Sequence, residues 1–230
     1  MLELARREVE LEKMQRLEHE RFLSMLTHEL KTPISIAKIN LSLSGIQGKE
    51  QERIARALKN MADVVERCNI SAAIEEKRLT IQPESFNVRQ VLDDLIGLWD
   101  AQDRVKFSEV KHLVHRTDCQ LFTIVVSNLL DNALKYSAPR SSILIAYGHK
   151  TVGGQNGVQV VVSNQIAPGT APDPTRIYTK YYRSKSAERK SGSGLGLYIS
   201  LGIAQVLGGT LHHQNSQNLW AFEFWSPILE

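Results

Sequence analysis

Disulfides, membrane-spanning segments and a strong charge of either sign are all missing from this sequence. Its two cysteines, Cys68 and Cys119, are too few and too isolated for a disulfide framework or a metal site. No apolar run approaches the roughly 18–20 residues that span a bilayer, and the charged N-terminus has no signal-peptide pattern. The net charge of +3 comes from basic residues interspersed with acids, which argues against nucleic acid as the main partner. These absences favour a protein of the reducing cytoplasm.

The residues that are present have an ordinary globular composition, with 42% hydrophobic and 23% charged side chains. A chain of 230 residues can hold a helical module and one compact domain with its own core. It begins inside a charged helix. We therefore expect the cytoplasmic portion of an inner-membrane protein, tethered to a membrane region that this sequence lacks. A soluble protein is the alternative.

Two helices with apolar stripes are expected before residue 80. Residues 3–43 contain one strong helix breaker, Pro33, and apolar residues recur there every three or four positions. Residues 45–48 end this helix, and a second follows over residues 50–77. Because two helices make little core alone, two copies of the hairpin should pair as a dimeric four-helix bundle.

From residue 86 onward the pattern alternates between helix and strand. We expect helices at 88–99, 119–136 and 194–207, with Asp118 capping the second. Strand-like runs lie at 105–110, 112–115, 143–148, 158–163, 210–214 and 220–225. A segment rich in Pro and Gly, 167–174, opens a long basic loop that reaches residue 190. Helices stacked on one mixed sheet make an α+β sandwich.

His28 lies on the first helix beside Glu29, with Thr32 one turn later. It falls opposite the apolar stripe, so its imidazole is expected at solvent or at a docking surface. Glu29 could orient the ring and accept its proton, which activates the other ring nitrogen as a nucleophile. Thr32 could position a water on the same face. By itself the pair fits an ordinary solvated histidine better.

A second motif, NLLDNALKYS, occupies residues 128–137. Asn128, Asn132 and Lys135 are spaced by four and three residues, which puts them on one helix face. Carboxamide oxygens suit Mg²⁺, and a nearby lysine suits phosphate. Taken alone, the stretch fits an amphipathic helix equally well.

A third motif, SGSGLGL, occupies residues 191–197 just before a predicted helix. Its glycines, Gly192, Gly194 and Gly196, allow close backbone approach and offer N–H groups to phosphates. The basic residues of the preceding loop would attract an anionic ligand. A solvated, mobile basic loop is the alternative interpretation.

In this order, the motifs resemble those of the sensor histidine kinases of two-component systems. Residues 22–33 are similar to the phosphoacceptor box, 128–137 to the asparagine box and 191–197 to the second glycine box. A further group of residues resembles the family's aromatic box: Tyr178, Tyr181, Tyr182 and Arg183. The resemblance covers nearly the whole chain and is weakest at its start and around 164–180. It implies a Bergerat-type ATP-binding fold of the GHKL ATPase superfamily.

The resemblance also implies the domains and the roles of residues. A signalling helix or coiled-coil entry (1–21) precedes a dimerisation and histidine phosphotransfer domain (22–80), a linker (81–85) and a catalytic ATP-binding domain (86–230). His28 would accept the phosphoryl group, with Glu29 as base and Thr32 at the phosphatase position. ATP and Mg²⁺ are the implied cofactors, and Asn128 and Asn132 would hold the metal. The implied nucleotide-binding residues are Asn128, Asn132, Lys135, Tyr136, Asn164, Arg183, Lys185, Gly192, Gly194, Leu195, Gly196 and Leu197.

One motif departs from the family. An aspartate usually follows the strand and receives the adenine amino group, with two glycines after it. Here Asn164 stands at that position and the glycines are missing or displaced to Gly169. Asparagine accepts the same hydrogen bond without the gain from charge, a difference of about 1 kcal/mol or roughly fivefold in affinity. Weaker or less selective ATP binding is therefore expected.

Three functions are compatible with these motifs. The first is a homodimeric kinase that phosphorylates His28 and passes the group to a response regulator receiver domain, with regulator phosphatase activity through Thr32. The second is a dimeric signalling scaffold or phosphatase-dominant variant with weak ATP binding. The third, a chaperone- or repair-type ATPase of the same fold, is disfavoured because such proteins lack a phosphoacceptor hairpin.

Overall fold

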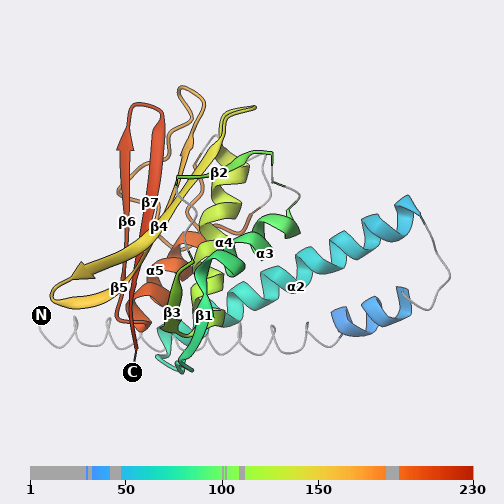
Figure 1. The fold of residues 1–230 in the computed structure, drawn as a ribbon. Coiled ribbons are helices and arrows are strands. Elements are labelled where there is room, and N and C mark those ends of the chain that lie inside the picture. Colours follow the sequence, from blue (N-terminus) through green and yellow to red (C-terminus); the bar gives the residue numbers. More distant parts are fainter. Residues whose placement is uncertain are drawn as a thin grey trace, which may run out of the picture. The chain divides into compact units, whose positions relative to one another are not determined.

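The computed structural model describes residues 30, 33–41, 48–99, 101, 103–108, 112–184 and 192–229. The chain divides into two compact units, Met1–Arg78 and Leu79–Glu230 (Figure 1). The described residues of the first unit form helices, and the second unit contains helices and strands. A mixed α+β second unit is what the alternating sequence pattern predicts.

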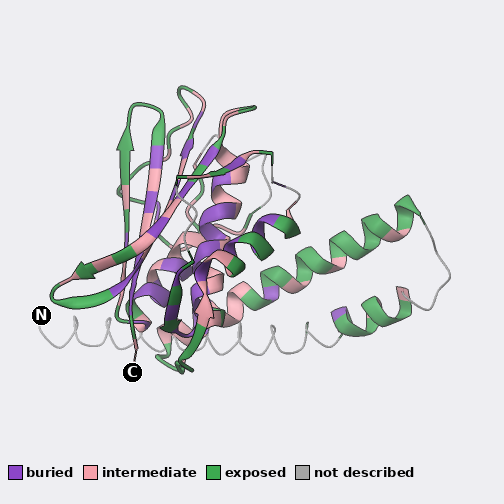
Figure 2. Cartoon of the chain, in the orientation of Figure 1, coloured by how far each residue is buried: buried purple, intermediate pink, exposed green. Residues whose placement is uncertain are grey.

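In the first unit, residues 33–41 are helical and α2 spans Lys49–Glu75. The predicted second helix is thus confirmed, with slightly shifted ends. Gly48 precedes α2 with φ of 79°, a left-handed conformation that favours glycine. Much of α2 is exposed (Figure 2). The exposed large apolar side chains of this unit are Leu30, Ile36, Ile39, Ile54, Met61 and Val64.

The second unit is built on a five-stranded mixed sheet with the strand order β2-β4-β5-β7-β6. Its strands are β2 (Val105–Phe107), β4 (Ile143–Val152), β5 (Gln155–Gln165), β6 (Thr210–Ser216) and β7 (Leu219–Pro227). β2 pairs parallel with β4, and the other pairs are antiparallel. A separate two-stranded sheet joins β1 (Glu84–Asn87) to β3 (Val114–Thr117). The helices are α3 (Val88–Leu98), α4 (Cys119–Tyr136) and α5 (Gly196–Val206).

The core lies between the sheet and the helices. Alternate residues of a strand share one face, and the buried alternate positions of β5 and β7 form an apolar inner face. Helices α4 and α5 contact each other; α4 also contacts β5 and β7, and α5 contacts β6 and β7. The largest fully buried side chains are Phe122, Phe224, Leu92, Leu129, Leu130, Ile143, Ile145, Leu195, Ile199, Ile203, Leu207 and His115. Figure 2 shows most of the buried residues, drawn in purple, in the second unit.

Asp118 caps α4, as the sequence predicts. One carboxylate oxygen accepts a hydrogen bond of 2.9 Å from the backbone N–H of Leu121, which satisfies a donor of the first turn. The other accepts a bond of 2.9 Å from the backbone N–H of Gln82. The cap therefore also ties the segment before β1 to the start of α4.

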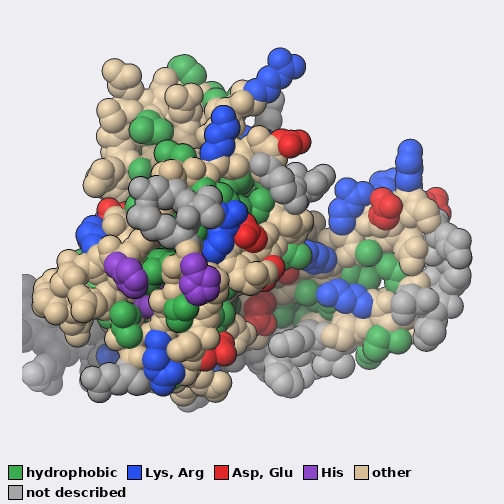
Figure 3. All heavy atoms as spheres, viewed as in Figure 1, with side chains coloured by type: hydrophobic (Ala, Val, Ile, Leu, Met, Phe, Trp, Pro, Cys, Tyr) green, Lys and Arg blue, Asp and Glu red, His purple; other side chains and the backbone are tan. Residues whose placement is uncertain are grey.

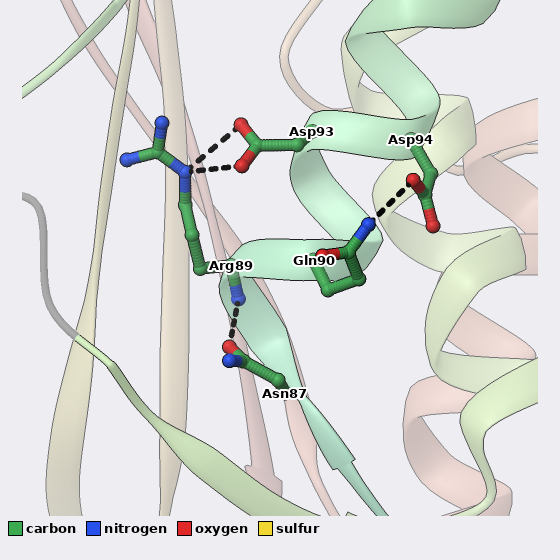
Figure 4. Close-up of polar contacts among 5 residues, drawn as sticks. All are labelled: Asn87, Arg89, Gln90, Asp93 and Asp94. Atoms are coloured by element: carbon green, nitrogen blue, oxygen red, sulfur yellow. Dashed lines mark hydrogen bonds and ion pairs between the residues drawn. The ribbon is translucent and has the colours of Figure 1, made fainter.

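Helix α3 begins at a second cap, which the sequence analysis did not identify. The side-chain oxygen of Asn87 accepts a hydrogen bond of 2.9 Å from the backbone N–H of Arg89 (Figure 4). The Nε of Arg89 donates to both carboxylate oxygens of Asp93, one turn later, at 2.9 and 2.8 Å. The guanidinium lies 4.0 Å from the ring centroid of Phe107. Arg89 thereby joins α3 to β2 at the edge of the sheet.

Strands β2, β6 and β7 differ from the predicted ranges at their ends, and larger differences occur elsewhere. β4 and β5 extend beyond 143–148 and 158–163, because Gly153 and Gly154, both at positive φ, form a two-residue turn that continues the pairing. The strand predicted at 112–115 lies instead at Val114–Thr117. Glu84 and Ser85, which the sequence analysis placed in the linker, are the first residues of β1. Such a short strand depends on a partner distant in the sequence.

The described helices include none that is long and apolar enough to cross a membrane. On the face shown in Figure 3, basic and acidic side chains are interspersed over the surface. This agrees with the small net charge of the sequence.

Candidate functional site

His28, Glu29, Thr32 and Lys185 lie outside the described residues. The phosphoacceptor helix and the phosphate contact of Lys185 therefore stay predictions. The other predicted site residues belong to the second unit.

Helix α4 positions the asparagine motif. Asn128 is buried, and its Nδ2 donates to the carbonyl oxygen of Gly196 and to the Oγ of Ser200, each at 3.3 Å. These bonds tie α4 to the start of α5 and use the amide hydrogens. The carboxamide oxygen is the part of Asn128 that suits a cation. Asn132, one turn later, is half-buried.

Lys135 has a partner that the sequence analysis did not identify. Its Nζ lies 2.7 Å from a carboxylate oxygen of Asp131, and both side chains are partly buried. The spacing of four residues on a helix was the available signal. A phosphate that approached Lys135 would have to share it with Asp131.

The positive charge of Arg183 affects the pKa of Tyr136 in the last turn of α4. Burial raises the pKa of the Tyr136 hydroxyl, the positive charge of Arg183 opposes this rise, and the negative charge of Asp131 adds to it. Arg183 itself is exposed. The structure thus places an exposed arginine close enough to Tyr136, a predicted site residue at the end of α4, for its charge to act on the hydroxyl.

Asn164 lies at the end of β5, next to the end of α4. The backbone N–H of Ala138 donates to the carbonyl of Gln165 at 2.6 Å, and Ser137 forms a β-bridge with Ile166. Asn164 is only 5% exposed, and its Nδ2 lies 3.4 Å from the carbonyl oxygen of Gln165. The position predicted to contact a base is therefore buried beside the asparagine helix.

Gly194 permits a close approach, although the approaching group is the chain itself. Its φ is 73°, and an added Cβ would lie 2.7 Å from the backbone carbonyl carbon of Tyr181. No side chain fits there without moving the loop. The glycine motif thus packs against the predicted aromatic box.

The rest of the glycine motif leads into α5. Gly192 is exposed, Leu195 is buried, and Gly196 and Leu197 are half-buried at the start of the helix. The first N–H groups of a helix have no partners within it and attract anions. This end of α5 could therefore receive phosphate groups.

The aromatic box is held by contacts with charged groups. The hydroxyl of Tyr182 accepts a bond of 2.8 Å from the backbone N–H of Asp173. The Nζ of Lys180 lies 5.5 Å from the ring of Tyr181 and 5.7 Å from that of Tyr198 on α5. Tyr198 was not identified from the sequence. These cation–π contacts connect the basic loop to α5.

Tyr178 begins a series of ring contacts with His213 and, through it, Trp220, two residues that the sequence analysis also missed. Its ring lies 5.7 Å from that of His213, which stacks on Trp220 at 5.6 Å and 8°. The Tyr178 hydroxyl and the Trp220 indole N–H are buried and have no partner among the described residues. Burial raises the pKa of Tyr178 to about 12. Burial, followed by the charge of His212, lowers the pKa of His213.

The arrangement suits a ligand with phosphates and a flat ring. It combines carboxamides, cationic side chains, a helix N-terminus and buried aromatic rings. Among the described residues, no group of three or more His, Cys, Asp or Glu side chains could hold a metal ion. A hard cation would therefore rely on the oxygens of Asn128 and Asn132 and on those of the ligand, a donor set that suits Mg²⁺.

Residues 117–228 match a family model described as histidine kinase-, DNA gyrase B-, and HSP90-like ATPase. The chain is 25% identical to the sensor histidine kinase HprS of Escherichia coli (strain K12), over 86% of this chain and 46% of that protein. It is 26% identical to the sensor histidine kinase ArsS of Helicobacter pylori, over 85% of this chain and 44% of that protein. The chain thus spans less than half the length of these relatives.

Two solved structures share the fold at 20% identity. Acinetobacter baumannii histidine kinase AdeS has a TM-score of 0.55 and covers 88% of this chain and 98% of its own. Full-length ShkA in complex with AMPPNP has a TM-score of 0.64 and covers 90% of this chain and 46% of its own. Together with the sequence matches, they confirm the resemblance to sensor histidine kinases with this type of ATPase domain.

Proposed function

We propose that this chain is the phosphoacceptor and catalytic part of a sensor histidine kinase. It binds Mg²⁺-ATP in the second unit, phosphorylates its own His28 and passes the phosphoryl group to an aspartate of a response regulator. The observation that carries this proposal is the convergence of four elements in one ATPase-type domain. Helix α4, the end of β5, the aromatic box and the start of α5 are joined by the contacts of Asn128, Ser137, Gly194 and Lys180.

Different groups of described residues bind the phosphates, the metal ion and the base of ATP. The N-terminal N–H groups of α5 receive phosphate oxygens, and Lys135 and Arg183 balance their charge. Asn164 and the buried aromatic rings receive the base. The carboxamide oxygens of Asn128 and Asn132 would hold Mg²⁺, which would supply positive charge to balance the phosphates. The bonds from Asn128 to α5 keep its carboxamide in place while the ligand binds.

Phosphoryl transfer follows from the predicted roles on the first helix. Glu29 accepts the proton from one ring nitrogen of His28 while the other attacks the γ-phosphorus of ATP. The new N–P bond forms as the bond to the β–γ bridging oxygen breaks, and ADP leaves. An aspartate of the regulator then attacks the same phosphorus and releases His28. Thr32 orients water for the hydrolysis of the phospho-aspartate.

The exposed apolar side chains of the helical unit support a homodimer. Ile54 and Met61 belong to the apolar stripe of α2, yet they are 41% and 52% exposed in the single chain. Two copies that pair as a four-helix bundle would remove these side chains from water. Tethering to an inner-membrane sensor region remains part of the proposal, supported by the greater length of the sensor kinases that the chain resembles.

A second candidate is a dimeric scaffold or phosphatase-dominant protein with weak ATP binding. Two observations favour it: Asn164 replaces a charged acceptor, and Lys135 is engaged with Asp131. This candidate predicts intact dephosphorylation of a phosphorylated regulator with little autophosphorylation.

The deciding experiment is incubation of the purified chain with γ-labelled ATP and Mg²⁺. The kinase should acquire acid-labile phosphate, and His28→Gln should lose it. His149→Gln is a matched control on β4 that should keep the label, because His149 lies outside the site. Equal labelling of wild type and His28→Gln would exclude His28 as acceptor. Absence of label with intact phosphatase activity would favour the second candidate.

A further inference from the structure

The strand register sets Asn164 between two uncharged neighbours. It lies opposite Ile143 on β4 and Trp220 on β7, and all three side chains are buried. Side chains opposite one another in antiparallel strands have Cβ atoms about 4.5–5.5 Å apart. The carboxamide therefore has an aliphatic side chain on one side and an indole on the other, and neither neighbour adds charge.

The carboxamide of Asn164 offers both kinds of hydrogen-bonding group. Its Oδ1 accepts and its Nδ2 donates, and a half-turn about χ2 exchanges their places. The bond from Nδ2 to the carbonyl of Gln165, at 3.4 Å, is longer than an ordinary N–H···O bond. A weak bond to the adjoining residue opposes such a turn only slightly. A carboxylate at this position would only accept.

Trp220 adds a buried donor beside this carboxamide. Trp220 is 3% exposed, and its indole N–H has no hydrogen-bond partner among the described residues. Buried polar groups in folded proteins are rarely left unpaired, so such a donor calls for a missing acceptor. The stack that continues through His213 to Tyr178 supplies aromatic surface next to it. A flat heterocycle with a ring nitrogen would satisfy both features.

We propose that Asn164 and Trp220 form a nucleobase subsite that accepts guanine as well as adenine. The subsite rests on the proposed function and names its substrate class, purine nucleoside triphosphates. The 6-amino group of adenine donates to Oδ1 of Asn164, whereas the 6-oxo group of guanine accepts from Nδ2. Both purines carry the ring nitrogens N3 and N7, either of which can accept from the Trp220 indole N–H.

The test compares the non-hydrolysable analogues AMP-PNP and GMP-PNP with Mg²⁺, by calorimetry on the full chain. Wild type should bind the two with dissociation constants within about tenfold of each other. Asn164→Asp should raise the ratio of the GMP-PNP to the AMP-PNP dissociation constant at least tenfold, because a carboxylate cannot donate to the 6-oxo group. Asn156→Asp, the same change at the exposed hairpin end of β5, should leave the ratio unchanged.

Trp220→Phe tests the second residue. It keeps an aromatic ring and removes the N–H, so both analogues should bind several-fold more weakly at an unchanged ratio. Unchanged affinities for both analogues would remove Trp220 from the subsite and overturn the proposal as stated.

The outcomes separate this inference from the function on which it rests. A wild-type preference for AMP-PNP above about a hundredfold, or a ratio unaffected by Asn164→Asp, would overturn the inference and leave ATP binding in place. If wild type bound neither AMP-PNP nor GMP-PNP, both this inference and the proposed function would be overturned. Circular dichroism checks the fold of each variant. If Asn164→Asp does not fold, the ratio of the two wild-type dissociation constants decides between the outcomes.

Discussion

The two units of this chain differ in where their apolar side chains lie. In the second unit, Val160 on β5 and Phe224 on β7 are fully buried on the inner face of the sheet. In the first unit, Met61 is 52% exposed although it belongs to a regular apolar stripe. A stripe of this kind normally faces a covering surface. The second unit thus has its own core, whereas the apolar stripe of the helical unit would be covered only in the proposed homodimer.

The largest expected effect comes from breaking the core of the second unit. The ring of Phe122 is fully buried, with centroid distances of 5.2 Å to Phe86 and 5.4 Å to Phe224. Phe122→Ala should lower the free energy of unfolding by about 3–5 kcal/mol, because a cavity replaces the ring. Urea unfolding followed by near-UV circular dichroism measures this. A loss below about 1 kcal/mol, the effect of an average substitution, would contradict a core built around this ring.

Acid should weaken the same core. Burial, followed by the charge of His149, lowers the pKa of His115 from 6.5 to about 4. Its Nε2 lies 3.2 Å from Ser226 Oγ, and its Nδ1 is buried with no partner among the described residues. Because the pKa is lower in the folded state, the neutral ring stabilises the fold fully above about pH 6.5. This contribution is lost as the pH falls towards 4 and amounts to about 3 kcal/mol.

Urea unfolding at several pH values would isolate this contribution. The free energy of unfolding of wild type should fall more steeply between pH 6.5 and 4 than that of His115→Gln, which cannot titrate. His112→Gln, at an exposed position before β3, is the matched control and should follow wild type. Parallel curves for wild type and His115→Gln would rule out His115 as the group responsible.

The proposed pairing of two helical units can be tested by placing a charge on the apolar stripe. Met61→Glu places a carboxylate on the apolar stripe of α2 and should raise the dissociation constant of the dimer at least tenfold, about 1.4 kcal/mol. Leu144→Glu is the control, since Leu144 on β4 is 44% exposed in the unit that has its own core. Analytical ultracentrifugation compares the two variants. A dimer weakened equally by both changes would place the interface elsewhere.

An effect of similar size is expected for the glycine motif. Gly194 and Gly154 both have positive φ, but an added Cβ at Gly154 meets nothing within 4 Å, whereas at Gly194 it meets the backbone of Tyr181. Each change to alanine should cost about 1–2 kcal/mol from backbone strain. Gly194→Ala should also weaken AMP-PNP binding, because the aromatic box must shift. Equal affinities in the two variants would argue against this contact.

Local patterns predicted much of the fold. The apolar spacing predicted α2 and α4, and Asp118 was recognised as a cap because its carboxylate stands just before an apolar helix. Pairing over long distances was less predictable. β1 carries no alternating pattern and exists because it pairs with β3, and the extra length of β4 and β5 depends on the turn between them.

Some residues of the candidate site could likewise be predicted from local motifs, whereas others could not. Asn132, Lys135, Arg183 and Gly194 were identified from motifs, because the chemistry of phosphate and magnesium calls for those residue types. Trp220 and His213 were missed, since neither belongs to a motif. Asp131 was missed although its spacing to Lys135 was available.

The sequence by itself determined the helices, most of the strands and the order of the motifs, because periodicity and capping act over a few residues. The tertiary structure alone decided what surrounds Asn164. Its neighbours, Ile143 and Trp220, lie on strands distant in the sequence, and a shift of one residue in register would have turned them to the other face. Packing of the whole sheet against α4 and α5 selects that register, so no local pattern could have revealed it.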